Sequence, residues 1–142
     1  MTMKTYHGSC HCGAVAFTAD IDFSRPSQRC NCSICNKTRT WFIGIPAADL
    51  TITKGEDALA DYTWTPSEKP PLGLHYHFCR ACGVRVFARG EEKSLGGPFY
   101  AVAIAALDDV ASDIDQITAS IRYVDGAHDE YSKSPADVRM MQ

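Results

Sequence analysis

The sequence predicts a mainly β protein. Short strand-like runs recur along its 142 residues between glycine, proline and aspartate, and no long helical repeat is present. The chain also contains no low-complexity segment and no long linker. Its composition is typical of a globular protein, with 45% hydrophobic and 22% charged residues. We therefore expect a single domain over residues 1–142, with a core at about 4–125 and a C-terminal tail at 126–142.

The expected strands follow one another through the whole core. They are Lys4–His7, Val15–Ala19, Arg25–Asn31, Trp41–Pro46, Leu50–Thr53, Ala60–Thr65, His75–Cys79, Val84–Ala88, Phe99–Ile104 and Ser120–Tyr123. Turn residues separate these runs: Gly8 and Asp20 follow the first two, and Pro46 closes the fourth.

Three further segments complete the expected order of elements. Ser33–Thr38 is expected to form a short helical turn. The proline-rich segment Thr65–Gly73 is expected to form an exposed loop before a strand. Gly90–Pro98 has the glycine and charge content of a mobile surface connection. The tail shows weak helical content and is expected to order only in part, through packing.

Charge and hydropathy exclude several classes of protein. A net charge of −3 and a pI near 5.9 argue against binding nucleic acid through bulk electrostatics. The first residues, "MTMKTYHG", contain no apolar run of the kind found in secretory signals. The longest apolar stretch, Tyr100–Leu107, is far too short to cross a bilayer. We expect a cytoplasmic protein without a membrane partner.

Seven cysteines are a large excess for a chain of this kind. Disulfides are rare in the cytoplasm, where clustered thiols usually serve metal binding or catalysis. The odd number, and the close Cys-x-Cys pairs, also fit a disulfide framework poorly. The cysteines therefore predict metal ligation.

The thiols form three groups. The groups are "SCHCG" (Cys10, Cys12), "CNCSIC" (Cys30, Cys32, Cys35) and "FCRACG" (Cys79, Cys82). Two close pairs can converge on one tetrahedral zinc. The first and last groups each end in glycine, which permits the positive φ that aims turn amides at sulfur. On this ground we pair them in one closed structural site, although the spacing alone permits other partitions.

The pairing leaves the triad Cys30, Cys32 and Cys35 together. Three protein ligands with a fourth position open to water or substrate are typical of a catalytic zinc, which would deprotonate an entering thiol. The alternative is a second structural zinc that is closed by a histidine. The candidate histidines are His11, His75 and His77.

The order Cys-x-Cys, Cys-x-Cys-x-x-Cys, Cys-x-x-Cys-Gly resembles the glutathione-dependent formaldehyde-activating enzyme family, which includes the centromere protein V-like proteins. The resemblance runs from about Tyr6 to Val110, and "GSCHCGAV", "CNCSIC" and "HFCRACGVRVF" are its strongest parts. Many members of the family carry histidine at the position of Asn31 and arginine after the last cysteine of the triad. This chain has Asn36-Lys37 there and is closer to the centromere-protein-like branch.

The resemblance implies an Mss4-like β-tent of small antiparallel sheets organised around zinc. It further implies that Cys10, Cys12, Cys79 and Cys82 hold a structural zinc, and that the triad holds a catalytic one. The implied reaction condenses glutathione with formaldehyde to S-hydroxymethylglutathione and is formally that of a carbon–sulfur lyase. The expected partner is therefore a small-molecule thiol or thiol adduct.

Two cations beside the triad are candidates for substrate binding. Lys37 and Arg39 lie where the carboxylates of glutathione would need cationic partners, although both are equally explained as solvated charges. Trp41 and Phe42 either wall a pocket or fill the core. Two other functions stay open: a zinc-stabilised binding module without catalysis, and a zinc hydrolase that uses metal-bound hydroxide.

Overall fold

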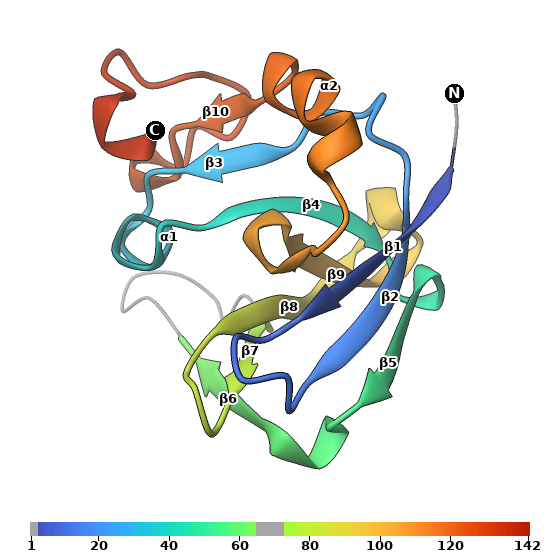
Figure 1. The fold of residues 1–142 in the computed structure, drawn as a ribbon. Coiled ribbons are helices and arrows are strands. Elements are labelled where there is room, and N and C mark those ends of the chain that lie inside the picture. The colour runs from blue at the N-terminus through green and yellow to red at the C-terminus, as the bar shows by residue number, and fades with distance from the viewer. Residues whose placement is uncertain (1–2, 65–72) are drawn as a thin grey trace.

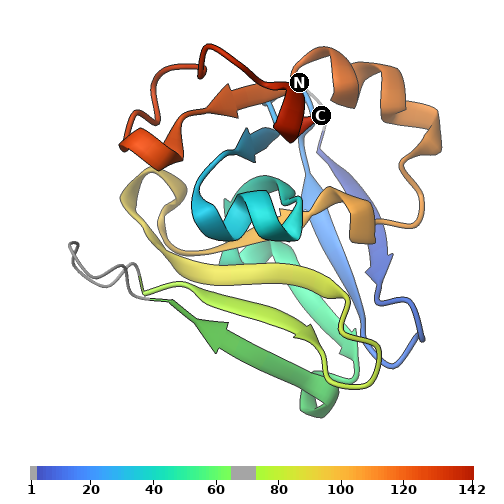
Figure 2. The same cartoon turned by 90° about the vertical axis from the view of Figure 1, so that its left-hand side faces the viewer.

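A computed structural model describes residues 3–64 and 73–142 of the chain. Figure 1 and Figure 2 show a mainly β structure, as expected. The strands are β1 (Lys4–Ser9), β2 (Ala16–Ile21), β3 (Gln28–Cys30), β4 (Trp41–Pro46), β5 (Leu50–Lys54), β6 (Leu59–Thr63), β7 (His75–Cys79), β8 (Arg85–Glu92), β9 (Gly97–Ala103) and β10 (Arg122–Val124). The α-helices are α1 (Ser33–Thr38) and α2 (Ile114–Ala119). Single 3-10 turns are η1 (Ala47–Asp49), η2 (Glu56–Ala58), η3 (Lys93–Leu95), η4 (Ile104–Ala106), η5 (Ala111–Asp113), η6 (Gly126–His128) and η7 (Arg139–Met141).

The strands form two sheets. A three-stranded sheet has the order β1-β2-β5, and a seven-stranded sheet has the order β10-β3-β4-β9-β8-β7-β6. Every pair of neighbouring strands is antiparallel except β10 and β3, which run parallel. The fold thus agrees with the expected antiparallel sheets, except at the parallel pair of β10 and β3. This pair brings the start of the tail beside the triad.

The hydrophobic core lies between the two sheets. Strand β2 alternates half-buried and buried residues, as expected for a strand with one face on a core. Phe17 on β2 meets Phe87 on β8 edge-to-face, with ring centroids 5.4 Å apart. Such a pair contributes about 0.5–1.5 kcal/mol beyond the area that it buries. Aromatic packing of this kind joins the small sheet to the large one.

The expected strands all exist, and their bounds differ for local reasons. Trp41–Pro46 and His75–Cys79 are found with the bounds expected, as is the helical turn Ser33–Thr38. The expected strand Arg25–Asn31 begins only at Gln28, because Asp22 first forms a turn by accepting a hydrogen bond from the amide of Ser24. Residue 65 of the expected strand Ala60–Thr65, and all but residue 73 of the expected loop Thr65–Gly73, lie outside the described residues.

Two expectations were wrong. Gly90–Pro98 is not a long loop: β8 and β9 continue into it and pair Gly90 with Phe99 and Glu92 with Gly97, around the single turn η3. Helix α2, which was not expected, packs Ile117 fully into the core. Pairing between β8 and β9 orders Gly90–Pro98, and burial of the Ile117 side chain stabilises α2.

No helix in the described parts of the chain combines the length and the apolar character needed to cross a membrane.

Candidate metal centres and the adjoining groove

Four cysteines from two distant loops converge at one point. Their sulfur atoms all lie within 4.8 Å of one another; the cysteines are Cys10, Cys12, Cys79 and Cys82. The first two lie in the loop between β1 and β2. Cys79 ends β7, and Cys82 lies in the loop that follows it. This four-cysteine set therefore ties the three-stranded sheet to the seven-stranded sheet (Figure 1).

The two loops are built alike. The amide of Cys10 donates to the carbonyl of Val15 at 3.1 Å, and the amide of Cys79 donates to the carbonyl of Val84 at 2.9 Å. Gly13 and Gly83 adopt φ values of +81° and +77°, the left-handed conformation that glycine adopts without a steric penalty. The amide of Val15 also donates to the sulfur of Cys10 at 3.3 Å. Both loops therefore have the glycine with positive φ that the sequence predicted after the second cysteine of each pair.

The geometry of the four-cysteine set fits a tetrahedral metal. Zinc–sulfur bonds of about 2.3 Å place the sulfurs of a tetrahedral site about 3.8 Å apart. The sulfur of Cys12 lies 3.7 Å from that of Cys10 and 3.6 Å from that of Cys79. Four soft thiolates are also a donor set that zinc prefers. These residues could hold a metal ion, and their assignment as zinc ligands stays a prediction.

The triad forms a second, separate cluster. The sulfurs of Cys30, Cys32 and Cys35 also lie within 4.8 Å of one another. Cys30 ends β3, Cys32 is the N-cap residue of α1, and Cys35 lies in its first turn. Residues three positions apart lie on one side of a helical turn, so α1 brings the thiols of Cys32 and Cys35 together. In the described parts of the chain, neither cluster includes His11, His75 or His77.

The triad is partly accessible and stabilises one thiolate. Cys30 is buried, whereas Cys32 and Cys35 are partly exposed. Hydrogen bonds from Cys30 and Cys35, together with the amides of Cys35 and Ile34, lower the pKa of the Cys32 thiol. Hydrogen bonds with Cys30 and Cys32, together with burial, raise the pKa of Cys35. The neighbouring thiols, and to a smaller extent the amides at the start of α1, thus favour negative charge at Cys32, as a cationic metal would also require.

The beginning of the tail is fastened over the triad by Asn31. The side-chain amide of Asn31 donates to Asp125 at 2.9 Å, and its oxygen accepts from the amide of Ala127 at 2.9 Å. Between these two residues, Gly126 packs so closely that an added Cβ would lie 2.4 Å from the sulfur of Cys30. Asn31, where many members of the resembling family have histidine, therefore positions the tail against the triad.

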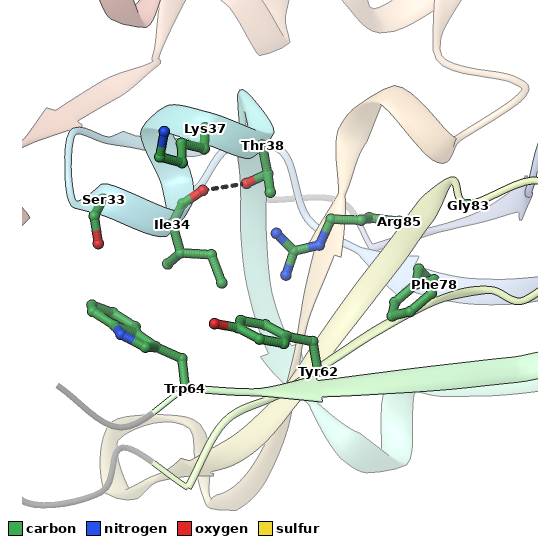
Figure 3. A pocket seen from close by; sticks show the side chains of 9 residues that line it. All are labelled: Ser33, Ile34, Lys37, Thr38, Tyr62, Trp64, Phe78, Gly83 and Arg85. Carbon is green, nitrogen blue, oxygen red and sulfur yellow. Dashed lines mark hydrogen bonds between the residues drawn. The ribbon is translucent and has the colours of Figure 1, made fainter.

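A groove of about 470 Å³ opens beside the triad (Figure 3). Helix α1 forms one wall, and β6 to β8 form the other. Its lining residues are Ser33, Ile34, Lys37, Thr38, Tyr62, Trp64, Phe78, Gly83 and Arg85. Ser33 and Ile34 lie between the second and third cysteines of the triad, so the groove and the triad share one short segment.

The two predicted substrate cations lie in different places. Lys37 lines the groove. Arg39 instead donates to main-chain oxygens of the tail, to Met140 and, at 2.7 Å, to Gln142. It also adopts a left-handed φ of 54°, where it ends α1. Arg39 is thus occupied in holding the tail, and the structure does not bring it together with Lys37 in the groove.

Sequence reasoning missed the aromatic and cationic walls of the groove. Trp41 packs against the core, and its indole N–H donates to Ser27 at 2.8 Å; neither Trp41 nor Phe42 lines the groove. Tyr62, Trp64 and Arg85 do line it. They lie 27 or more positions beyond Cys35 in the chain, and no spacing rule links them to the triad. The alternation of Arg85 with valines in "VRV" was the one available sign that its side chain leaves the core face.

Comparison with known proteins agrees with the site geometry. A sequence model of the family described as "Glutathione-dependent formaldehyde-activating enzyme" matches residues 5–123, which include both cysteine clusters. The chain is also 35% identical, over 85 residues, to a Halomonas elongata protein named "Putative glutathione-dependent formaldehyde-activating enzyme". That match covers 53% of this chain and 50% of the relative, so the chain spans about half the length of this curated relative.

A solved structure shares the fold. The crystal structure of a Rhodobacter sphaeroides protein from structural genomics superposes with a TM-score of 0.61 at 26% identity. The match covers 78% of this chain and 96% of that one.

Proposed function

The chain belongs to the glutathione-dependent formaldehyde-activating enzyme family, and we propose that it is a zinc-dependent enzyme of the carbon–sulfur lyase type. Its substrate would be a thiol adduct, such as the adduct of glutathione and formaldehyde. The observation that carries this proposal is the separation of the cysteines into a four-membered set between the sheets and a three-membered set beside a groove. The fourth position at the triad is then left to a substrate sulfur.

Zinc is the metal that we propose for both clusters, because both consist of thiolates alone. When bound by the triad, zinc would lower the pKa of a thiol that completes its coordination. The four-cysteine set would contribute folding energy, because the unfolded chain does not hold its two loops together. A reducing compartment such as the cytoplasm would keep all seven cysteines available.

The reaction that we propose is the addition of a thiol to a carbonyl group. The carbon–sulfur bond forms while the carbonyl π bond breaks, and the proton lost by the thiol ends on the new hydroxyl oxygen. The groove would orient the substrate so that its sulfur faces the triad, and Lys37 would attract an anionic group at the rim. Asn31 and Asp125 would hold the triad loop against the tail during turnover.

Exchange NMR with 13C-formaldehyde and glutathione tests this function. The native protein should accelerate formation and breakdown of S-hydroxymethylglutathione above the spontaneous rate. Cys32→Ser should reduce the acceleration by about 100-fold or more, since metal-ion catalysis supplies several kcal/mol. Asn36→Ala, at an exposed neighbour of Cys35, is the control and should keep the native rate. A protein that holds about two zinc ions per chain but gives no acceleration would instead indicate a binding module.

A further inference from the structure

The groove beside the triad has a size and a lining that suit a small organic molecule. Its volume of about 470 Å³ lies within the range of small-molecule sites, which is about 300–1,000 Å³. Tyr62, Trp64 and Phe78 supply aromatic surface on the sheet side, and Ile34 supplies aliphatic surface on α1. Figure 3 shows these side chains around a common space. Such walls favour an apolar body on the ligand.

Arg85 places a half-buried cation in this apolar setting. Its Nη1 atom is inaccessible to solvent and has no hydrogen-bond partner in the described parts of the chain. The ion pairs found there do not include Arg85. Figure 3 shows its guanidinium directed into the space between Ile34 and Tyr62. A buried charged N–H group without an acceptor is destabilising, so the Nη1 atom is satisfied only when a ligand accepts its hydrogen bond.

The surroundings of Arg85 hold it in this position and connect it to the triad. Its guanidinium carbon lies 4.5 Å from the centroid of the Tyr76 ring. This cation–π contact helps to hold the guanidinium group in place. Burial is the main cause of a lowered pKa of Arg85. Because Ile34, the chain neighbour of Cys35, lines the same groove, Arg85 faces the segment that carries the triad.

We propose that the groove binds a thiol adduct that carries a carboxylate on an apolar body, and that Arg85 is the residue that binds the carboxylate. A guanidinium matches a carboxylate with two parallel hydrogen bonds, and apolar walls strengthen that pair by excluding water. Glutathione fits this lining less well, because it is a polar tripeptide with two carboxylates and an ammonium group. The thiol part of this inference rests on the proposed function, whereas the carboxylate part does not.

Two probes without a thiol test the carboxylate part on the full chain as purified. They are 3-phenylpropanoate and its neutral counterpart 3-phenylpropan-1-ol, with binding followed by calorimetry. The native protein should bind the acid more tightly than the alcohol. Arg85→Gln should weaken binding of the acid by about 10- to 100-fold and change binding of the alcohol by less than about twofold. Arg89→Gln removes an exposed arginine of the same strand and should leave both affinities unchanged.

The inference is wrong if the native protein binds both probes equally, or if Arg85→Gln weakens both to the same extent. The first comparison uses unmodified protein, so it decides the matter even if Arg85→Gln fails to fold. Arg85→Lys is a second variant, which keeps the positive charge but cannot form the two parallel hydrogen bonds of a guanidinium group. Its affinity for the acid should lie between those of the native protein and Arg85→Gln.

A third measurement tests the substrate class separately from the proposed function. With formaldehyde, 2-mercapto-3-phenylpropanoate should react with a higher kcat/KM than glutathione. A preference for glutathione would overturn the substrate class while leaving the proposed function intact. Absence of catalysis with both thiols would contradict the proposed function, and the two probes without a thiol would still decide the role of Arg85.

Discussion

Single residues close to the triad show how tightly its surroundings are packed. Asn31 uses both ends of its side-chain amide to hold residues 125–127 in place. This arrangement brings Gly126 against the sulfur of Cys30, where a hydrogen atom fits and a methyl group does not. The side chain of Cys30 is therefore oriented by a residue almost a hundred positions away. Close packing of this kind transmits even a one-carbon change to the cluster.

Gly126→Ala should disturb the triad without unfolding the protein. The new Cβ would lie 2.4 Å from the Cys30 sulfur and 3.3 Å from the Cβ of Cys32, so these atoms must move apart. Overpacking of this kind costs about 1–3 kcal/mol, and the zinc content should fall from about two to about one per chain.

Gly96→Ala is the control for Gly126→Ala. It meets no atom within 4 Å but is strained by its φ of +89°, so it should lower stability and keep both metals. Equal zinc contents for the two variants would contradict the packing argument.

At the scale of elements, β1 is tied to the segment before α2 by a small charged cluster. Asp113, in η5, accepts a hydrogen bond from the Tyr6 hydroxyl at 2.7 Å and from the Lys4 ammonium at 2.9 Å. These bonds hold the pKa of Asp113 below its usual value. Burial and the same hydrogen bond raise the pKa of Tyr6. The edge strand of the small sheet is thus fastened to a helical segment that follows 100 residues later.

The stabilisation from Asp113 should disappear in acid. A carboxylate with a lowered folded-state pKa stabilises the fold above its unfolded pKa of about 3.9, and this contribution is lost as the pH falls through the folded pKa. Asp113→Asn should therefore lower the urea midpoint at pH 7 and flatten its decline below about pH 4. Asp115→Asn, on α2, is the matched control. A parallel pH dependence for native protein and Asp113→Asn would refute this role.

For the whole molecule, the four-cysteine set connects the two sheets. Its loops belong to hairpins in different sheets, and the core lies between those sheets. A structural zinc of this kind contributes about 10–16 kcal/mol of apparent binding energy, which is as large as the whole stability of a typical domain of about 5–15 kcal/mol. The triad, by contrast, joins only β3, α1 and the start of the tail.

Losing one ligand from each cluster should have unequal effects. Cys79→Ser should unfold the protein, because the lost metal energy equals or exceeds the net stability. Cys32→Ser should keep a cooperative thermal transition and lose about one zinc per chain. Circular dichroism melting and metal analysis of the purified variants would measure both effects. Equal losses of stability would mean that the triad is a second structural site.

Local chemistry made a large part of this structure predictable. The spacing of "CNCSIC" predicts a helical turn at Ser33–Thr38, and the structure confirms it. The glycines after Cys12 and Cys82 predict positive φ, which both adopt. The bounds of the strand His75–Cys79 were equally predictable, because turn residues lie close to both of its ends. Helix α2 was missed because it is short and depends on burial of Ile117 more than on any periodic pattern.

The amino-acid order alone was enough to predict the mainly β class, the family and three local groups of thiols, since strand patterns and cysteine motifs each span only a few positions. Only the structure brings the first and last groups together. It was not enough to establish what surrounds the triad. Arg39 faces the tail, which lies more than 100 positions away, while Arg85 faces the groove. Both are arginines beside cysteine motifs, and only the pairing of distant strands separates Arg39, which holds the tail, from Arg85, whose Nη1 atom has no hydrogen-bond partner among the described residues.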